Sequence, residues 1–289
     1  MIGGLVRAAA GRLRRARYRN SLSAPYVSGD LFRSLCDVAL DLTSPAVRRQ
    51  FEQSHRHARA IFVKTDLLPE FLAEFAAGAT ACRVLITGNS DLEVHEVPGG
   101  LPTGLRRWFA QNAHLADRLV RPLPIGLENH ALGRNGRLSL FRTCSDQELS
   151  EKRLRMFAGF GTTTPERQGL QGQLAESPLV DVAQERVAPR IFQRALRGYR
   201  FVIAPRGNGV DTHRFWESLY ADAIPITRRS SWSRAIAAGG VPCIEVDAWT
   251  DVLSWTPAHL AHLSGTFTAR LSSAPWLWAD YWRAEIAAS

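Results

Sequence analysis

The chain has 289 residues, of which 45% are hydrophobic and 22% charged, a composition typical of a globular protein and not of a disordered or fibrous one. At this length one or two domains are expected, with a core large enough to need neither disulfides nor a structural metal. The formal net charge of +9 is concentrated in residues 1–20, which carry six arginines and no acid, so that +3 remains for the rest of the chain.

Residues 1–20 form a basic arm with apolar residues at near-helical spacing, which predicts an amphipathic helix on an anionic membrane surface. A solvated basic arm is the alternative. Nucleic acid is not expected as a partner, because no aromatic residue precedes Tyr18 and no recognition motif is present. An arginine interrupts the apolar core that a signal peptide needs, and no segment is apolar enough to span a membrane. We therefore expect a cytoplasmic protein, peripheral on the inner membrane face.

Residues 21–148 are expected to form a first α/β domain. Short apolar runs alternate there with helical patterns: strands are predicted within 58–66, 82–91 and 118–129, and helices within 31–42, 67–78 and 104–113. The repeated order of strand, polar loop and helix predicts a parallel sheet.

A second α/β domain is expected over residues 149–255, because core signals are sparse in 143–157 until Leu154. Its apolar strands are predicted within 153–161, 179–183, 199–209, 223–229 and 241–247. Residues 256–289 form a helical segment that ends in a tryptophan-rich helix over 274–288, which we expect to dock against another element. Scattered cysteines without a CxxC spacing argue against a disulfide framework or zinc site.

Residues 200–232 carry the clearest chemical signal. An apolar strand over 201–204 leads into PRGNG (205–209), whose glycines permit positive φ and close backbone approach. A helical stretch follows over 210–223, which Asp211 or Thr212 would cap. Ligands of open parallel sheets bind at the carboxyl ends of strands, and a helix N-terminus favours phosphate. The strand, loop and helix therefore predict a phosphate site.

Arg214 and Glu217 lie three residues apart in this helix and so share a face. An arginine can bind a diphosphate through two parallel hydrogen bonds, while a carboxylate can accept hydrogen bonds from both hydroxyls of a ribose. Together they suit a nucleotide sugar. An ordinary surface ion pair beside a turn is the alternative, because a glycine-rich loop alone is a weak signal.

The string PRGNGVDTHRFWESLYADAIPI (205–226) resembles the donor-binding signature of exostosin-like glycosyltransferases. That signature joins a Pro-Gly-rich loop, an Asp-x-x-Arg-x-x-x-Glu helix and a small-Ile-Pro-Ile strand. Asp222 stands where the family usually has glycine. The upstream segments 28–33, 62–68, 86–91 and 108–129 resemble, more loosely, the acceptor half of bacterial proteins of this type.

The resemblance implies a GT-B architecture: two facing Rossmann-like domains with parallel sheets and a C-terminal helix. The donor would bind the second domain and the acceptor largely the first. It also implies metal-independent transfer without a cofactor, and the chain has no Asp-x-Asp motif. With no metal, cations and helix amides must stabilise the leaving group.

The family's roles carry over to matching residues. Arg214 would hold the diphosphate and Glu217 the ribose. The remaining donor-site candidates are Arg206, Gly207, Asn208 and Gly209 in the loop, Asp211, Thr212 and His213 at the helix start, and Arg167 and Arg228 as further positive charges.

A catalytic base is expected from the first domain, because direct displacement needs a carboxylate or imidazole near the acceptor hydroxyl. Asp30 and Asp91 both end apparent strands and are the candidates. Each equally fits a helix cap or turn former.

The sequence as a whole predicts an inverting glycosyltransferase that moves a sugar from a nucleotide-sugar donor to a glycan or lipid-linked acceptor of the surface polysaccharide or lipopolysaccharide type. Two alternatives stay open. One is a non-catalytic α/β protein that binds a nucleotide or phosphosugar. The other is an arginine-tail adaptor for membrane or nucleic acid, whose α/β body is only a scaffold.

Overall fold

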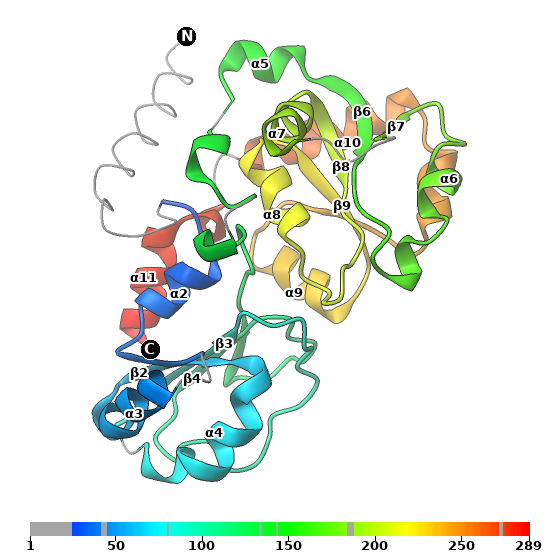
Figure 1. Ribbon diagram of the computed structural model, residues 1–289. Helices are drawn as coiled ribbons and strands as arrows, with labels where there is room; N and C mark the ends of the chain where they lie inside the picture. The colour runs from blue at the N-terminus through cyan, green and yellow to red at the C-terminus, as the bar shows by residue number, and fades with distance from the viewer. Residues whose placement is uncertain are drawn as a thin grey trace.

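The structure is a computed structural model, shown in Figure 1, that describes residues 25–41, 45–79, 81–132, 135–142, 144–183, 188–271 and 274–289. The basic arm over residues 1–20 lies outside these ranges, so the amphipathic helix expected there stays a prediction. All of the predicted donor-site residues and both candidate bases lie within them.

Within the described residues, the strands form two five-stranded sheets in which every neighbouring pair is parallel. The first sheet has the order β1-β2-β3-β4-β5, with strands β1 (Val38–Leu40), β2 (Ala60–Lys64), β3 (Val84–Gly88), β4 (Arg107–Ala110) and β5 (Val120–Pro122). The second has the order β10-β9-β8-β6-β7, with strands β6 (Arg153–Ala158), β7 (Val180–Val182), β8 (Tyr199–Ile203), β9 (Ile224–Arg228) and β10 (Ile244–Val246). We call the parts built around these sheets the first and the second domain.

Helices cover the sheets and connect their strands. The α-helices are α2 (Gly29–Ser34), α3 (Pro45–Ser54), α4 (Leu68–Glu74), α5 (Asp146–Glu151), α6 (Leu170–Leu174), α7 (Pro189–Arg197), α8 (His213–Tyr220), α9 (Ser231–Ala238), α10 (Pro257–Leu271) and α11 (Ala279–Ala288). The 3-10 turns are η1 (His55–His57), η2 (Thr65–Leu67), η3 (Ala76–Gly78), η4 (His130–Leu132), η5 (Leu138–Leu140), η6 (Pro165–Arg167), η7 (Trp249–Ser254) and η8 (Pro275–Leu277).

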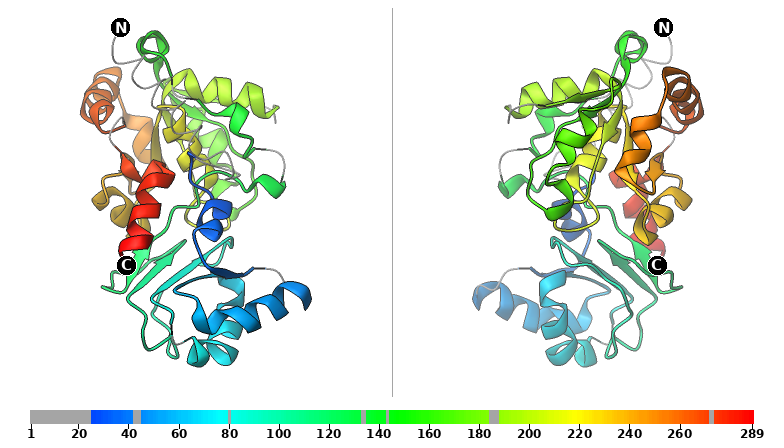
Figure 2. Two further views of the ribbon diagram at one scale, coloured as in Figure 1. Left: turned by 90° about the vertical axis from the view of Figure 1, so that its left-hand side faces the viewer. Right: turned by 90° about the vertical axis from the view of Figure 1, so that its right-hand side faces the viewer.

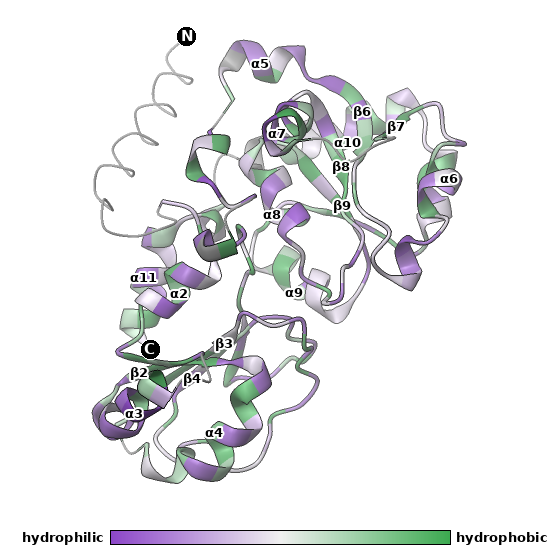
Figure 3. Ribbon diagram, in the orientation of Figure 1, coloured by the Kyte–Doolittle hydropathy of each residue, from purple (hydrophilic) through white to green (hydrophobic). Residues whose placement is uncertain are grey.

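The first sheet is buried on both faces. Along β2, Ile61 and Val63 pack with residues of α3 and α4, whereas Phe62 belongs to a larger core that extends into the second domain. Successive side chains of a strand point to opposite faces, so one apolar run supplies both cores. In Figure 3, α4 and α7 carry hydrophilic and hydrophobic colours together, as helices with one face on a core do.

The C-terminal helix α11 crosses back to the first domain, where it lies beside α2 (Figures 1 and 2). Trp282 is fully buried, with its ring 5.5 Å from that of Phe32 and 6.1 Å from that of Phe109. Arg121 of β5 pairs with Glu285 and donates to the Tyr281 hydroxyl. The predicted docking of the tryptophan-rich helix is confirmed, and this helix ties the two domains together.

The second sheet has the strand order of a flavodoxin-like doubly wound fold. Taken in chain order within the domain, its five strands lie in the order 2-1-3-4-5. Two α/β domains with parallel sheets and a C-terminal helix that returns to the first are the arrangement that the sequence predicts as GT-B. The first sheet differs from a Rossmann sheet, because its strands lie in sequential order without a reversal.

Two of the predicted helices are wrong. Within 31–42, the helix ends at Ser34 and residues 38–40 form β1, which pairs with β2. Within 104–113, residues 107–110 form β4 between β3 and β5, where Trp108 and Phe109 are buried on opposite faces. A short run that is apolar on both faces has no alternating pattern, so a strand is easily mistaken for a helix.

Candidate functional site

A cavity of about 640 Å³ lies at the carboxyl ends of β6 and β8. These strands are neighbours in the second sheet, and β7 lies on the far side of β6, so the direction of the crossovers reverses between β6 and β8. Doubly wound sheets bind their ligands in the crevice at such a point. The loops after both strands and the first turn of α8 line this cavity, which we call the donor cavity.

The donor cavity brings together most of the site residues that the sequence predicts. Its lining includes Arg167, Gly207, Asn208, Gly209, Asp211, Thr212, His213, Arg214 and Glu217, and one candidate base of the first domain, Asp91. Arg206, Arg228 and Asp30 are not among its lining residues.

The side chains of Arg228 and Asp30 have other partners. Arg228 lies at the exposed end of β9, where its Nη2 donates to the carbonyl of Asp247 at 3.1 Å. Asp30 lies in the first turn of α2, and its Oδ2 accepts from the backbone N–H of His130 at 2.8 Å. The structure therefore brings Asp91, and not Asp30, to the cavity wall.

Arg214 is fixed in position, but one of its guanidinium nitrogens makes no hydrogen bond to the described residues. Its Nε donates to Glu217 Oε2 at 3.1 Å, and its Cζ lies 3.9 Å from the ring centroid of Phe192 on α7. Its Nη1 is buried and has no hydrogen-bond partner among the described residues. A buried, charged donor without an acceptor is costly, so this arrangement is that of a site built for an anion.

Arg167 brings a second positive charge to the same cavity. Its Nε and Nη2 donate to the carbonyls of Arg206 and Pro205, at 2.8 and 2.9 Å, which ties the loop after β6 to the loop after β8. Burial lowers the pKa of Arg167, and the nearby charge of Arg214 lowers it further. An anion bound between them would relieve that repulsion.

The loop after β8 is shaped by close approach to the first domain. A side chain at Gly209 would place its Cβ 2.7 Å from Asn112 Nδ2, and Asn112 is fully buried. Of the two expectations for the glycines of this loop, close backbone approach is confirmed at Gly209, whereas neither Gly207 nor Gly209 is among the described residues with positive φ. Gly209 is needed for space instead.

Asp211 joins the two domains at the wall of the cavity. Its Oδ2 accepts from the backbone N–H of Ile125 at 2.6 Å, and its Oδ1 accepts from Trp216 Nε1 at 2.7 Å. Its own N–H donates to Asn112 Oδ1 at 2.9 Å. These contacts fix the start of α8 against the segments after β4 and β5. Thr212, the N-cap residue, makes no side-chain capping hydrogen bond.

The buried carboxyl of Asp211 gives the stability a pH dependence. Burial raises its pKa from 3.8 to about 7, against hydrogen bonds that act in the opposite direction. Its contribution to stability is therefore complete below about pH 4 and is lost as the pH rises through 7. We expect the free energy of unfolding of wild type, relative to Asp211→Asn, to fall by about 2 kcal/mol between pH 5.5 and pH 8. Urea unfolding of both proteins at both pH values measures this difference in free energy of unfolding. A difference that stays constant or rises with pH would contradict the prediction.

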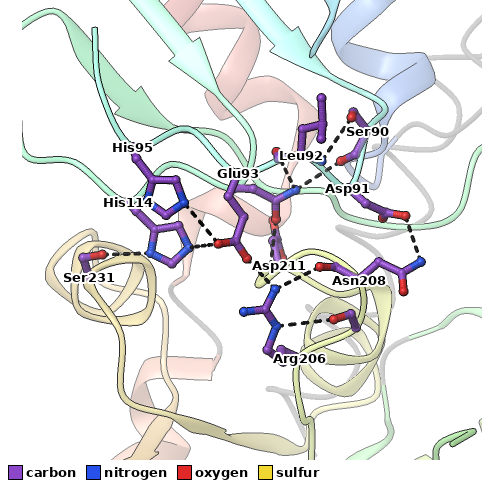
Figure 4. Close-up of polar contacts among 12 residues, drawn as sticks. Ser90, Asp91, Leu92, Glu93, His95, His114, Arg206, Asn208, Asp211 and Ser231 are labelled. Carbon is purple, nitrogen blue, oxygen red and sulfur yellow. Dashed lines mark hydrogen bonds and ion pairs between the residues drawn. The ribbon is translucent and has the colours of Figure 1, made fainter. Parts of the chain in front are cut away.

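Arg206 belongs to a charged network between the domains, which Figure 4 shows. Its Nη2 donates to Glu93 Oε1 at 2.7 Å. Glu93 Oε2 lies 3.3 Å from His114 Nε2 and 3.4 Å from His95 Nε2, and His114 Nδ1 lies 2.9 Å from Ser231 Oγ. Burial lowers the pKa of His114, which Glu93 partly offsets. Arg206 thus holds the loop after β8 to the first domain.

A second cavity, of about 350 Å³, lies at the carboxyl ends of β2 and β3 and is called the polar cavity below. Most of its lining is polar and includes Lys64, Asp66, Asn89, Ser90, Asp91 and Asn129. Asp91, Ile125 and His213 line both cavities, so the two meet at these residues. Asn208 Nδ2 of the second domain donates to Asp91 Oδ2 at 3.0 Å across this boundary (Figure 4).

Several residues of the site were not predicted from the sequence. Phe192 lies under Arg214 from a helix that follows β7, and no local pattern links the two. Lys64 and Asp66 could have been found from the sequence, since they stand at the polar end of the apolar run of β2. Glu93 contacts Arg206 across the domains, and only the folded chain reveals that contact.

In the part of the chain that the structure describes, no three His, Cys, Asp or Glu side chains are grouped as metal ligands. Metal independence stays a prediction. In the same residues, no helix is both long and apolar enough to cross a bilayer.

Similarity to known proteins is found among solved structures. No family model and no curated protein matches the sequence. Among solved structures, the chain is similar to an alpha,alpha-trehalose-phosphate synthase (UDP-forming) from Burkholderia vietnamiensis, with a TM-score of 0.41 and 10% identity, over 84% of this chain and 67% of that one. A similarity this low supports no conclusion about activity.

Proposed function

We propose that this protein is a glycosyltransferase that takes a sugar from a nucleotide-sugar donor, and that its donor site is the exostosin-like one around residues 205–226. The observation that carries this proposal is Arg214, whose buried Nη1 has no partner in the described residues and which lines a cavity at the reversal point of the second sheet. A diphosphate supplies the acceptors that this arginine lacks.

In this proposal the diphosphate lies between Arg214 and the start of α8. Thr212 makes no side-chain cap, so the amides of His213 and Arg214 are the ones we propose for a phosphate oxygen, while the amide of Phe215 donates to the Thr212 carbonyl. Glu217 orients Arg214 through one carboxylate oxygen and accepts from a ribose hydroxyl with the other. Phe160 and Phe192 supply apolar surface for the rest of the nucleotide.

The leaving nucleoside diphosphate gains negative charge as the sugar departs. Two arginines, Arg214 and Arg167, with the α8 amides can stabilise that charge, which supports the proposal of a metal-independent reaction. Because the polar cavity adjoins the donor cavity, we propose it for a glycan acceptor that attacks from the far side of the sugar, with inversion. A lipid-linked acceptor of the polysaccharide or lipopolysaccharide type, met at a membrane through residues 1–20, is part of the same proposal.

The test is release of nucleotide by the wild-type protein. UDP-, GDP-, dTDP-, ADP- and CMP-sugars are offered one at a time, with water and with a mixture of glycans as acceptors, and the free nucleotide is measured. We expect steady release from one nucleoside diphosphate sugar. Tight binding of a nucleotide without release from any donor would instead identify a non-catalytic binding protein.

A further inference from the structure

The proposed transfer needs a proton acceptor at the boundary between the donor cavity and the polar cavity, and we propose that this acceptor is His213. The inference rests on the proposed function, since it names the residue that activates the acceptor. The attacking hydroxyl must reach the donor sugar where the two cavities meet. Asp91, Ile125 and His213 are the residues that line both cavities, and Ile125 cannot accept a proton.

The imidazole of His213 is fixed in a form that can accept a proton. Its Nδ1 lies 2.8 Å from the carbonyl oxygen of Gly126, and a carbonyl only accepts hydrogen bonds. Nδ1 therefore carries the hydrogen, which leaves the lone pair on Nε2. No hydrogen bond to Nε2 is made by any residue that the structure describes, so the lone pair is available to a substrate hydroxyl.

The carbonyl that orients His213 is itself held rigidly. Gly126 has φ of +65°, and a Cβ there would lie 2.2 Å from the backbone oxygen of Val27. Residues other than glycine are strained in such a conformation and would also collide. Since Gly126 belongs to the segment after β5 and His213 to α8, the imidazole is oriented only while the two domains are in contact.

The carboxylates of the two cavities are already engaged. Glu217 accepts from Arg214, and Asp211 accepts from Ile125 and Trp216.

Three further carboxylates line the cavities. Glu128 Oε2 accepts from the backbone N–H of Asn135 at 2.6 Å, and Asp66 pairs with Lys64 at 3.2 Å. Asp91 accepts from Asn208 through Oδ2 and is exposed to solvent. Asp91 is thus the rival that an experiment must separate from His213.

The proposed step exchanges the bond between sugar and diphosphate for a new glycosidic bond. The acceptor hydroxyl oxygen forms a bond to the anomeric carbon of the donor sugar, and the bond from that carbon to the diphosphate oxygen breaks. The bonding electrons leave with the nucleoside diphosphate, next to Arg214. The hydroxyl proton passes to Nε2 of His213, and the resulting imidazolium later returns it to solvent.

The test compares His213→Asn with Asp91→Asn. Asparagine places an amide N–H near the position of Nδ1, so His213→Asn is designed to keep the hydrogen bond to Gly126 while it removes Nε2. Both variants and wild type are first checked for protection against heat by UDP and GDP. The rate of nucleotide release is then measured with water and glycans as acceptors, and again with azide, an anionic nucleophile that has no proton to lose.

We expect His213→Asn to bind nucleotide like wild type, to lose at least about 100-fold in rate with hydroxyl acceptors, and to recover with azide as a glycosyl azide forms. Asp91→Asn changes the lining of both cavities, so any loss it shows should be the same with azide as with hydroxyl acceptors. Full activity of His213→Asn, or a loss in Asp91→Asn that azide restores, overturns the assignment and leaves the proposed function standing. Failure of wild type to bind or turn over any donor overturns the proposed function itself, and with it the role of His213.

Discussion

Replacing Arg214 by alanine is expected to weaken the binding of a nucleoside diphosphate by about 100-fold or more. Arg214 is a half-buried cation at the donor cavity whose Nη1 is buried and has no hydrogen-bond partner among the described residues. Losing one partner of a buried, charged hydrogen-bonded pair costs about 2–5 kcal/mol, and each 1.4 kcal/mol is tenfold in affinity. Isothermal titration of wild type and Arg214→Ala with the same nucleotide measures the difference.

Two matched variants sharpen this experiment. Arg228→Ala removes an arginine that lies outside the donor cavity, so the affinity should stay within about twofold of wild type. Arg214→Lys keeps the charge and loses the planar fork, so an intermediate affinity is expected. If Arg214→Ala binds nucleotide as wild type does, Arg214 is not the diphosphate residue.

Removal of the Glu217 carboxylate should destabilise the fold in addition to weakening nucleotide binding. Glu217 is 4% exposed and holds Arg214, so Glu217→Ala leaves a buried guanidinium without its carboxylate. Breaking a buried pair from one side typically costs about 3–5 kcal/mol. We expect a loss near the lower value, because the Arg214 side chain keeps 20% of its surface exposed. Urea unfolding followed by tryptophan fluorescence measures it.

The double variant Arg214→Ala/Glu217→Ala provides the internal control. It removes both charges together, so its loss of stability should be smaller than the sum of the two single losses by at least about 1 kcal/mol. Strict additivity would mean that the two side chains do not interact energetically in the folded protein.

The parts of the site that could be predicted from the sequence are those that are contiguous in it. The strand, the loop and the first turn of α8 lie within residues 200–217, so their order and spacing are visible in the chain. Asp222, which stands where the exostosin-like signature usually has glycine, also has a local explanation. Asp222 takes φ of +54°, the left-handed conformation that glycine adopts readily, and its carboxylate accepts from the N–H of Cys144.

The contacts between the domains could not be predicted. Asp211 and Ile125 are 86 positions apart, and Arg206 and Glu93 are 113 apart. No periodicity relates such residues, and their proximity depends on how the two sheets face each other. Arg206 is an example, because it is a predicted phosphate-loop residue whose side chain instead pairs with Glu93 of the first domain.

Secondary structure was missed where burial removes the pattern. In β4, Trp108 and Phe109 face different cores, so the run has no polar face to distinguish a strand from a helix. The left-handed backbone of Asn89 and Asn112, with φ of +55° and +54°, could not be predicted from the sequence either, because asparagine tolerates this conformation without requiring it. Both lie near the boundary of the two cavities, where backbone strain is often associated with a binding site.

Thermal unfolding of the wild-type protein with nucleotides tests the central claim most directly. The claim is that the donor cavity binds a nucleoside diphosphate. UDP, GDP, dTDP, ADP and CDP are compared with their nucleosides at equal concentration. A ligand at 100 times its Kd stabilises the native state by about 2.7 kcal/mol, so at least one diphosphate should raise the Tm by several degrees while its nucleoside raises it far less. If no nucleoside diphosphate raises the Tm, or if the nucleosides stabilise the protein equally well, the claim is contradicted.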